Sequence, residues 1–230
     1  MGTVGVIFLS LGATPELREL TQQAVDSCIA SDKDVNFKIL VCEGVEGVKY
    51  NGAWVTHPPR NKPFNYNEYF NICRVHPLFD ACTYFALCNN DLVFEKGWAS
   101  SLIEKMKEHK VLSACPMDPR IHPEVKFTDG VSKGHQVTAG DRHVAGWCIF
   151  QHKDIYSVIE NLTTECEFWH SDVMYAAQLM NHSLEHILVE DSKVHHLTSR
   201  TLNSSAVSES TRYYYTEGSP IHKKIYGNIS

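Results

Sequence analysis

Apolar runs alternate with amphipathic stretches along the first third of the chain. Residues 4–10 predict a buried strand, and Thr14-Pro15-Glu16 predicts a helix start, with threonine as N-cap, proline at the first helical position and an acid in the first turn. This helix is expected to reach about Ala30, and residues 36–42 are expected to form the second strand. Such a β-α-β opening favours a parallel sheet with a binding crevice beyond the carboxyl ends of its strands.

The alternation continues to the end of the second third and beyond. We expect helices at 65–75, 97–107 and 172–184, and strands at 84–91, 111–115, 144–150 and, as a short pair, 187–189 and 193–196. The polar, weakly patterned segment 118–142 is typical of a functional lid or binding segment. Together the elements predict a single Rossmann-like α/β domain, with a central mixed, mainly parallel sheet flanked by helices.

The C-terminal end of the strand predicted at 84–91 is the most informative feature of the sequence. Its apolar and aromatic residues stop abruptly at Asn89, Asn90 and Asp91. The oxygen atoms of such side chains suit Mg²⁺ or Mn²⁺, and the carboxyl edge of an open sheet is where ligands bind. The same three residues also favour an ordinary turn, so the local pattern alone leaves both interpretations open.

Composition and charge exclude several classes of protein. The net charge of −6 argues against an extended basic face for nucleic acid but leaves a local basic groove open, and neither Gly-x-Gly-x-x-Gly nor a P-loop sequence is present. Eight scattered cysteines without a Cys-x-x-Cys pair indicate buried thiols in a reducing compartment. The first apolar run is too short for a signal peptide or a membrane span, so we expect a soluble, cytoplasmic protein.

One alternative metal site comes from histidine spacing. His182 and His186 lie four residues apart, as in helical zinc motifs, but the glutamate that should follow the first histidine is Ser183. The helical pattern also fades near Leu184, which disfavours zinc there.

Five segments, in this order along the chain, resemble the GT-A glycosyltransferases of the family 2-like, inverting kind. They are Phe70-Asn71-Ile72-Cys73; Leu87-Cys88-Asn89-Asn90-Asp91 followed by Gly97-Trp98; Val144-Ala145-Gly146-Trp147-Cys148-Ile149; Phe168-Trp169-His170-Ser171-Asp172; and Val194-His195-His196-Leu197-Thr198-Ser199. Two departures stand out. The usual Asp-x-Asp has one carboxylate here, Asp91, and the usual Glu-Asp pair is Ser171-Asp172.

The resemblance implies one GT-A domain over residues 1–230. Residues 1–91 would form the nucleotide-sugar half, 92–198 the acceptor half and 199–230 a C-terminal tail. It implies Mn²⁺ or Mg²⁺ on Asp91 and His196, and Asp172 as the general base for transfer with inversion. It further implies donor contacts from Ser10, Glu43, Arg60, Asn71, Asn89, Asn90 and Arg200, and acceptor-side positions at Gly146, Trp147 and Trp169.

Each of these roles has an ordinary structural alternative. His196 could be a simple core or surface histidine, and Asp172 could only cap its helix. Arg60 and Arg200 could be solvated surface cations, although an arginine also suits bidentate binding of a diphosphate.

The partner implied by the resemblance is a nucleotide-sugar donor, with UDP-sugars favoured, and a hydroxyl acceptor. Phage enzymes that glycosylate DNA bases are similarly compact, and Arg212, the tyrosines 213–215, Lys223 and Lys224 could contact a nucleic acid. Other soluble acceptors are a glycan, a protein or a small molecule.

Two rival functions are a non-catalytic nucleotide- or saccharide-binding module and a nucleotidyltransferase, for which the loop after residue 10 is a poor match. The sequence leaves the oligomeric state open.

Overall fold

The computed structural model describes residues 2–59, 64–137, 141–167, 169–198 and 200–214. Its first elements confirm the predicted β-α-β opening, and the hydroxyl of Thr14 accepts a hydrogen bond from the Leu17 N–H at the helix start. The opening comprises β1 (Thr3–Ser10), α1 (Pro15–Ser31), β2 (Asn36–Glu43) and β3 (Trp54–Thr56).

The later elements follow the predicted order. They are α2 (Tyr66–Arg74), β4 (Tyr84–Asn89), β5 (Leu92–Phe94), α3 (Trp98–His109), β6 (Ser113–Met117), β7 (Val131–Lys133), β8 (Cys148–His152), α4 (Ser171–Asn181), β9 (His186–His196) and α5 (Glu209–Tyr213), with short 3-10 turns at Pro77–Phe79 and Lys153–Ser157. Among these described helices, none combines the length and apolar character needed to cross a membrane.

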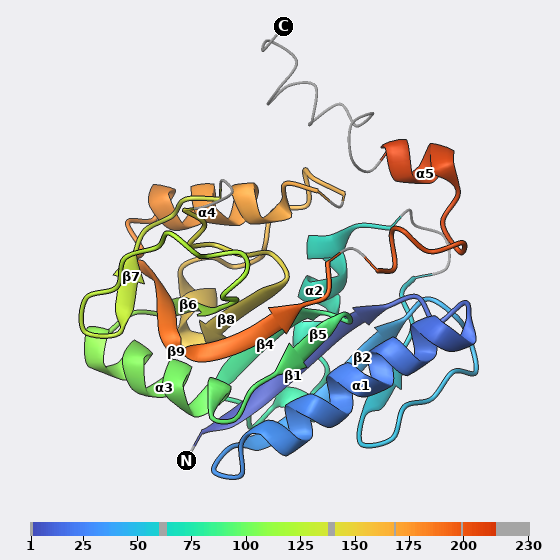
Figure 1. Cartoon of the computed structure of the whole chain (residues 1–230), viewed down its shortest axis with the longest axis horizontal. Coiled ribbons are helices and arrows are strands. Elements are labelled where there is room, and N and C mark those ends of the chain that lie inside the picture. The colour runs from blue at the N-terminus through green and yellow to red at the C-terminus, as the bar shows by residue number, and fades with distance from the viewer. Residues whose placement is uncertain (1, 60–63, 138–140, 168, 199, 215–230) are drawn as a thin grey trace, which may run out of the picture.

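The described strands form one mixed sheet in the order β3-β2-β1-β4-β8-β6-β9-β5, with β7 paired to β9. Strands β3, β2, β1 and β4 run parallel, whereas β8 is antiparallel to both β4 and β6. In Figure 1, α1 lies across the β1–β2 part of the sheet, while α4 lies beyond β8 and β9. The prediction of a mixed α/β sheet flanked by helices is therefore confirmed.

Two predicted strand boundaries were wrong. The segment expected at 144–150 enters the sheet only at Cys148, because Val144 to Trp147 form an irregular stretch around Gly146. The expected pair 187–189 and 193–196 is one long strand, β9, whose register to β6 jumps from Val189 to Lys193. The intervening polar residues are accommodated as a bulge, and the strand continues to a new antiparallel partner, β5. This continuation brings His196 to the tip of β4, where its Nε2 lies 3.4 Å from Asn89 Nδ2.

The histidine pair considered for zinc is separated by the fold. His182 follows the last residue of α4, whereas His186 begins β9 and is buried, with Nδ1 2.8 Å from Ser113 Oγ and Nε2 3.0 Å from the His143 carbonyl oxygen. The two residues do not share a helix, so the zinc alternative is excluded. Burial lowers the pKa of His186 to about 3.

We expect this burial to make the fold acid-sensitive. His122 is also buried, which lowers its pKa to about 4. Both rings stay neutral in the folded chain but take up protons near pH 6.5 in the unfolded chain. Stability is therefore complete above pH 6.5 and falls as the pH drops towards 4, by about 2 kcal/mol per ring at pH 5.

Melting curves between pH 7.5 and 5 check this expectation. His186→Gln should flatten the pH dependence of the melting temperature, whereas the control His182→Gln, at an exposed position, should not. Equal slopes for wild type and His186→Gln would contradict the explanation.

Candidate functional site

A carboxylate and an imidazole meet at the carboxyl edge of the sheet. Asp91, in the turn between β4 and β5, has Oδ1 3.2 Å from Nε2 of His196, the last residue of β9. The side chains are only 4% and 12% exposed. The geometry is not that of a hydrogen bond, so Asp91 Oδ1 has no such partner among the described residues. A buried carboxylate oxygen left without a partner is costly and calls for a ligand.

The backbone on both sides keeps the Asp91 carboxylate in place. Its Oδ2 accepts from the Arg200 N–H at 3.2 Å, and its carbonyl oxygen accepts from the Leu197 N–H at 2.8 Å. These bonds fasten the segment after β9 to the turn after β4, and they leave Oδ1 directed at His196. The predicted donor residue Arg200 is thus adjacent to the site through its main chain, and its side chain is exposed.

Tyr66 connects this pair to the segment around Gly146. The buried Tyr66 hydroxyl lies within hydrogen-bonding distance of two acceptors, Asn89 Oδ1 and the Gly146 carbonyl oxygen at 2.8 Å, which share its single proton. Burial, with further contributions from Cys88 and from the Asp91 and Asp172 carboxylates, raises the pKa of Tyr66 well above its ordinary value. The phenol therefore remains a proton donor between the two halves of the site.

Trp147 packs against His196 from the other side. Its indole stacks on the His196 ring, with centroids 5.6 Å apart and planes 20° apart. Trp147 is 3% exposed, so its indole packs behind His196 and offers little surface to a bound molecule. Its sequence-based placement beside the acceptor remains a prediction.

Asp172 lies in the first turn of α4, beside Gly146. A Cβ on Gly146 would stand 3.2 Å from the Asp172 Cβ and 3.5 Å from its Oδ2, so the missing side chain allows α4 to approach. Asp172 Oδ2 is 3.8 Å from Arg142 Nη1, and the Asp172 side chain is 15% exposed. A helix N-terminus and a nearby guanidinium both stabilise a carboxylate. The arrangement suits a general base at the rim of the site.

Glu43 and Ser10 occupy the tips of β2 and β1 but point into the protein. The Glu43 carboxylate is fully buried: Oε1 accepts from the N–H groups of Gly12 and Val45, and Oε2 accepts from the Tyr50 hydroxyl at 2.6 Å. Ser10 Oγ lies 2.8 Å from Thr21 Oγ1. In this structure both residues stabilise the chain segments at the sheet edge. Their hydrogen bonds favour this structural role over direct contact with a nucleotide-sugar donor.

Two predicted donor ligands make structural bonds instead. Asn71 donates to the Leu162 carbonyl and accepts from the Leu162 N–H, at 2.8 and 2.9 Å, so both amide atoms are engaged away from the Asp91–His196 pair. Asn90 donates to Thr21 Oγ1 and accepts from Thr201 Oγ1. A polar side chain near a strand tip can equally serve as a cross-link, and sequence spacing alone does not separate the two roles.

The three remaining predicted positions are Trp169, Asn89 and Arg60. Trp169 precedes α4 and is 43% exposed, which leaves its face available to an acceptor. Asn89 faces both the site tyrosine and the imidazole of His196, with Nδ2 3.4 Å from Nε2. Arg60 lies outside the described residues.

Sequence reasoning missed four residues that shape the site: Tyr66, Asp118, Arg120 and Arg142. Three of them lie in the segment 118–142 or at its start, which was expected to carry function but had no pattern to single out positions. The only available signal was the polar character of Asp118-Pro119-Arg120 directly after a strand.

The side chains of Asp91 and His196 fit a divalent ion that takes its remaining ligands from a bound molecule. Among the described residues, no group of three histidine, cysteine or acidic side chains could form a complete metal site. Asp91 and His196 offer one carboxylate oxygen and one imidazole nitrogen, a pair suited to Mn²⁺ whose other ligands would be diphosphate oxygens and water.

No protein-family model matches the chain, and no curated protein has a detectably similar sequence. Solved structures do match. A structure of GalNAc-T7 with UDP, GalNAc and Mn²⁺ superposes with a TM-score of 0.69 over 98% of this chain, at 10% identity. The chain has the GT-A glycosyltransferase fold. S. aureus TarS 1-349 gives a TM-score of 0.56 over 84% of this chain, also at 10% identity.

This GT-A chain spans only part of those proteins, 48% of the GalNAc-T7 chain and 59% of the TarS chain. At 10% identity the likeness carries the fold and not the substrates. The activity of this GT-A domain must therefore be inferred from its own residues.

Proposed function

We propose that the chain is a glycosyltransferase that moves a sugar from a nucleotide diphosphate, preferably UDP, to a hydroxyl acceptor with inversion. The observation that carries this proposal is the buried Asp91–His196 pair at the carboxyl edge of a GT-A sheet, with Asp91 Oδ1 lacking a hydrogen-bond partner among the described residues. The GalNAc-T7 structure that shares the fold contains UDP and Mn²⁺, which supports the choice of donor class.

Asp91 and His196 would hold Mn²⁺ or Mg²⁺. Bound there, the ion supplies positive charge to the diphosphate leaving group. The chain itself supplies the orientation: Asp91 is fixed by the Arg200 and Leu197 N–H groups, and His196 by stacking on Trp147. The exposed Arg200 side chain, next to this pair, is proposed to bind a diphosphate oxygen.

Asp172 is proposed to accept the proton of the attacking hydroxyl. A base for in-line displacement must lie on the acceptor side, across the reacting carbon from the leaving group. Asp172 stands at the start of α4, beside the exposed Trp169, whereas the proposed metal ligands come from β9 and the turn after β4. We place the acceptor between them, with residues 1–91 mainly on the donor side and 92–198 mainly on the acceptor side.

Within the proposed function, a glycan, protein or small-molecule hydroxyl is favoured as the acceptor over a DNA base. Arg212, expected to follow a nucleic-acid backbone, instead donates to the carbonyl oxygens of Leu202 and Ser204. Tyr213 and Tyr214 are 55% and 41% exposed, but the net charge of −6 opposes binding to DNA. Salt-sensitive retention of DNA by the protein would reverse this preference. Tyr215, Lys223 and Lys224 lie outside the described residues.

A thermal-shift panel tests the proposal. UDP, GDP, CDP and dTDP, and representative UDP- and GDP-sugars, are each added with and without Mn²⁺. A ligand that binds only the folded chain raises its melting temperature. We expect a Mn²⁺-dependent shift with UDP and UDP-sugars. No shift with any nucleotide would contradict the proposed donor site.

A non-catalytic module is the second candidate, favoured by the presence of a single carboxylate, Asp91, in the strand-tip motif. It predicts the same nucleotide shift with no hydrolysis of the UDP-sugar in long incubations. Slow release of UDP from a UDP-sugar, dependent on Asp172, would exclude it.

A further inference from the structure

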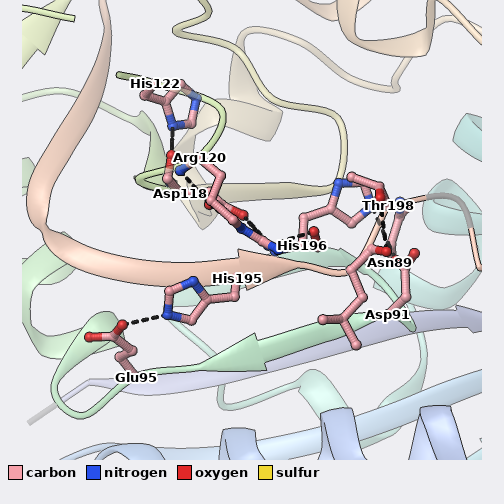
Figure 2. A network of polar contacts seen from close by, with 10 residues as sticks. Asn89, Asp91, Glu95, Asp118, Arg120, His122, His195, His196 and Thr198 are labelled. Atoms are coloured by element: carbon pink, nitrogen blue, oxygen red, sulfur yellow. Dashed lines mark hydrogen bonds and ion pairs between the residues drawn. The ribbon is translucent and has the colours of Figure 1, made fainter. Parts of the chain in front are cut away.

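An ion pair takes over the role of a neighbouring strand at the end of β9. Strand β6 runs parallel to β9 but ends at Met117, before β9 reaches His196. Beyond that point the Asp118 carboxylate accepts the His196 N–H at 2.7 Å, and the Arg120 guanidinium donates to the His196 carbonyl oxygen at 2.8 Å. Both main-chain groups of His196 are therefore bound by side chains (Figure 2).

Asp118 and Arg120 are themselves joined at several points. Arg120 donates from Nε to Asp118 Oδ1 at 3.2 Å and from Nη2 to Oδ2 at 2.9 Å, and its backbone N–H also bonds Oδ1. The Asp118 side chain is fully buried, which raises its pKa, but the hydrogen bonds from Arg120 and from the His196 N–H outweigh burial and lower the pKa overall. The pair is thus a charged, preformed unit.

The bound residue is the one with the metal-facing ring. On the opposite edge of β9, His196 is in register with Leu92 of β5, and its ring stacks on Trp147. Figure 2 shows Asp118 and Arg120 on one side of His196 and Asn89 and Asp91 on the other. The neighbouring His195 points elsewhere, to Glu95 at 2.5 Å. The bonds from Asp118 and Arg120 therefore constrain the position of the His196 imidazole and not that of His195.

We propose that Asp118 and Arg120 are positioning residues that set the divalent-cation affinity of the Asp91–His196 pair. This inference rests on the proposed function, because it presumes that the pair binds a cation. Partners that orient a metal ligand typically change metal affinity or activity by about 10- to 100-fold when they are removed. Among the residues that the structure describes, only Asp91 and His196 would hold the ion, so each must be well placed.

Mn²⁺ binding to the whole chain in the presence of UDP, followed by the electron paramagnetic resonance signal of free Mn²⁺, tests this role. Arg120→Met is the main variant: the Arg120 side chain is 56% exposed, so the variant should fold. We expect its Mn²⁺ dissociation constant to rise by about tenfold or more. Asp118→Asn should act in the same direction. Arg120→Lys, which keeps the charge but not the fork, should fall between wild type and Arg120→Met.

Two controls separate positioning from general destabilisation. Lys133→Met breaks an exposed ion pair with Glu185 and should leave Mn²⁺ affinity unchanged. Melting temperatures without metal or nucleotide show whether the folded chain itself has changed. The Mn²⁺ concentration that gives half-maximal transfer should rise in parallel with the dissociation constant.

An Arg120→Met protein with Mn²⁺ affinity within twofold of wild type would overturn the inference. His196→Ala distinguishes this failure from failure of the proposed function. If His196→Ala loses Mn²⁺ binding while Arg120→Met retains it, the metal pair stands and only the positioning role falls. If wild type and His196→Ala bind Mn²⁺ equally, both fall.

Discussion

Replacing Asp172 with asparagine is expected to lower kcat for sugar transfer by about 10²- to 10⁴-fold, the usual contribution of a general base. Asparagine keeps the shape of the side chain and its local bond: the Val173 N–H now donates to Asp172 Oδ1 at 2.9 Å. The variant should therefore fold normally and keep the Mn²⁺-dependent stabilisation by UDP, while losing only the ability to take up the proton.

Steady-state transfer and a UDP thermal shift, measured on the same preparation, check this expectation. Asp191→Asn is a matched control, since it makes the same chemical change at an exposed position in the bulge of β9. Transfer by Asp172→Asn within tenfold of wild type would remove the proposed base. Loss of the UDP shift would instead mean that Asp172 supports the donor site.

Replacing Asp91 with asparagine is expected to abolish the Mn²⁺-dependent part of the UDP shift and to lower transfer by about 10²- to 10³-fold, because metal stabilisation of the leaving group is worth several kcal/mol. The amide oxygen can still accept from the Arg200 N–H, so the turn after β4 should persist. The change removes the negative charge next to His196 Nε2 without removing the side chain.

The readouts are Mn²⁺ titration of the UDP thermal shift and transfer at saturating Mn²⁺. Asp191→Asn again serves as the control for a carboxylate lost elsewhere on the surface. If Asp91→Asn kept the wild-type Mn²⁺ response, the cation would have to bind elsewhere, and the metal role of His196 would fall with it.

The order of elements in this chain follows from local physics. A threonine cap followed by proline defines the start of α1, and continuous apolar runs define β1, β2 and β4, because these signals act between residues close in sequence. The abrupt end of β4 at Asn89 also lies at the edge of the sheet where the parallel strands β1, β2 and β4 present their carboxyl ends.

Contacts between distant segments could not be predicted in the same way. The sequence pattern predicted two short strands where β9 is continuous, because a bulge interrupts the alternation of side chains without interrupting the strand. Only that continuation brings His196 to within 3.4 Å of Asn89, 107 residues earlier in the chain.

Local patterns of apolar and polar residues were enough to predict the α/β class, the ends of the first strands and the polar residues that follow them. Which of those polar residues face one another depends on contacts between distant segments. Asp91 retains a carboxylate oxygen without a hydrogen-bond partner among the described residues, while Glu43, Asn71 and Asn90 have their polar atoms engaged by other parts of the chain. The physical reason is that a buried polar group binds whatever packing places beside it, and packing depends on the whole fold.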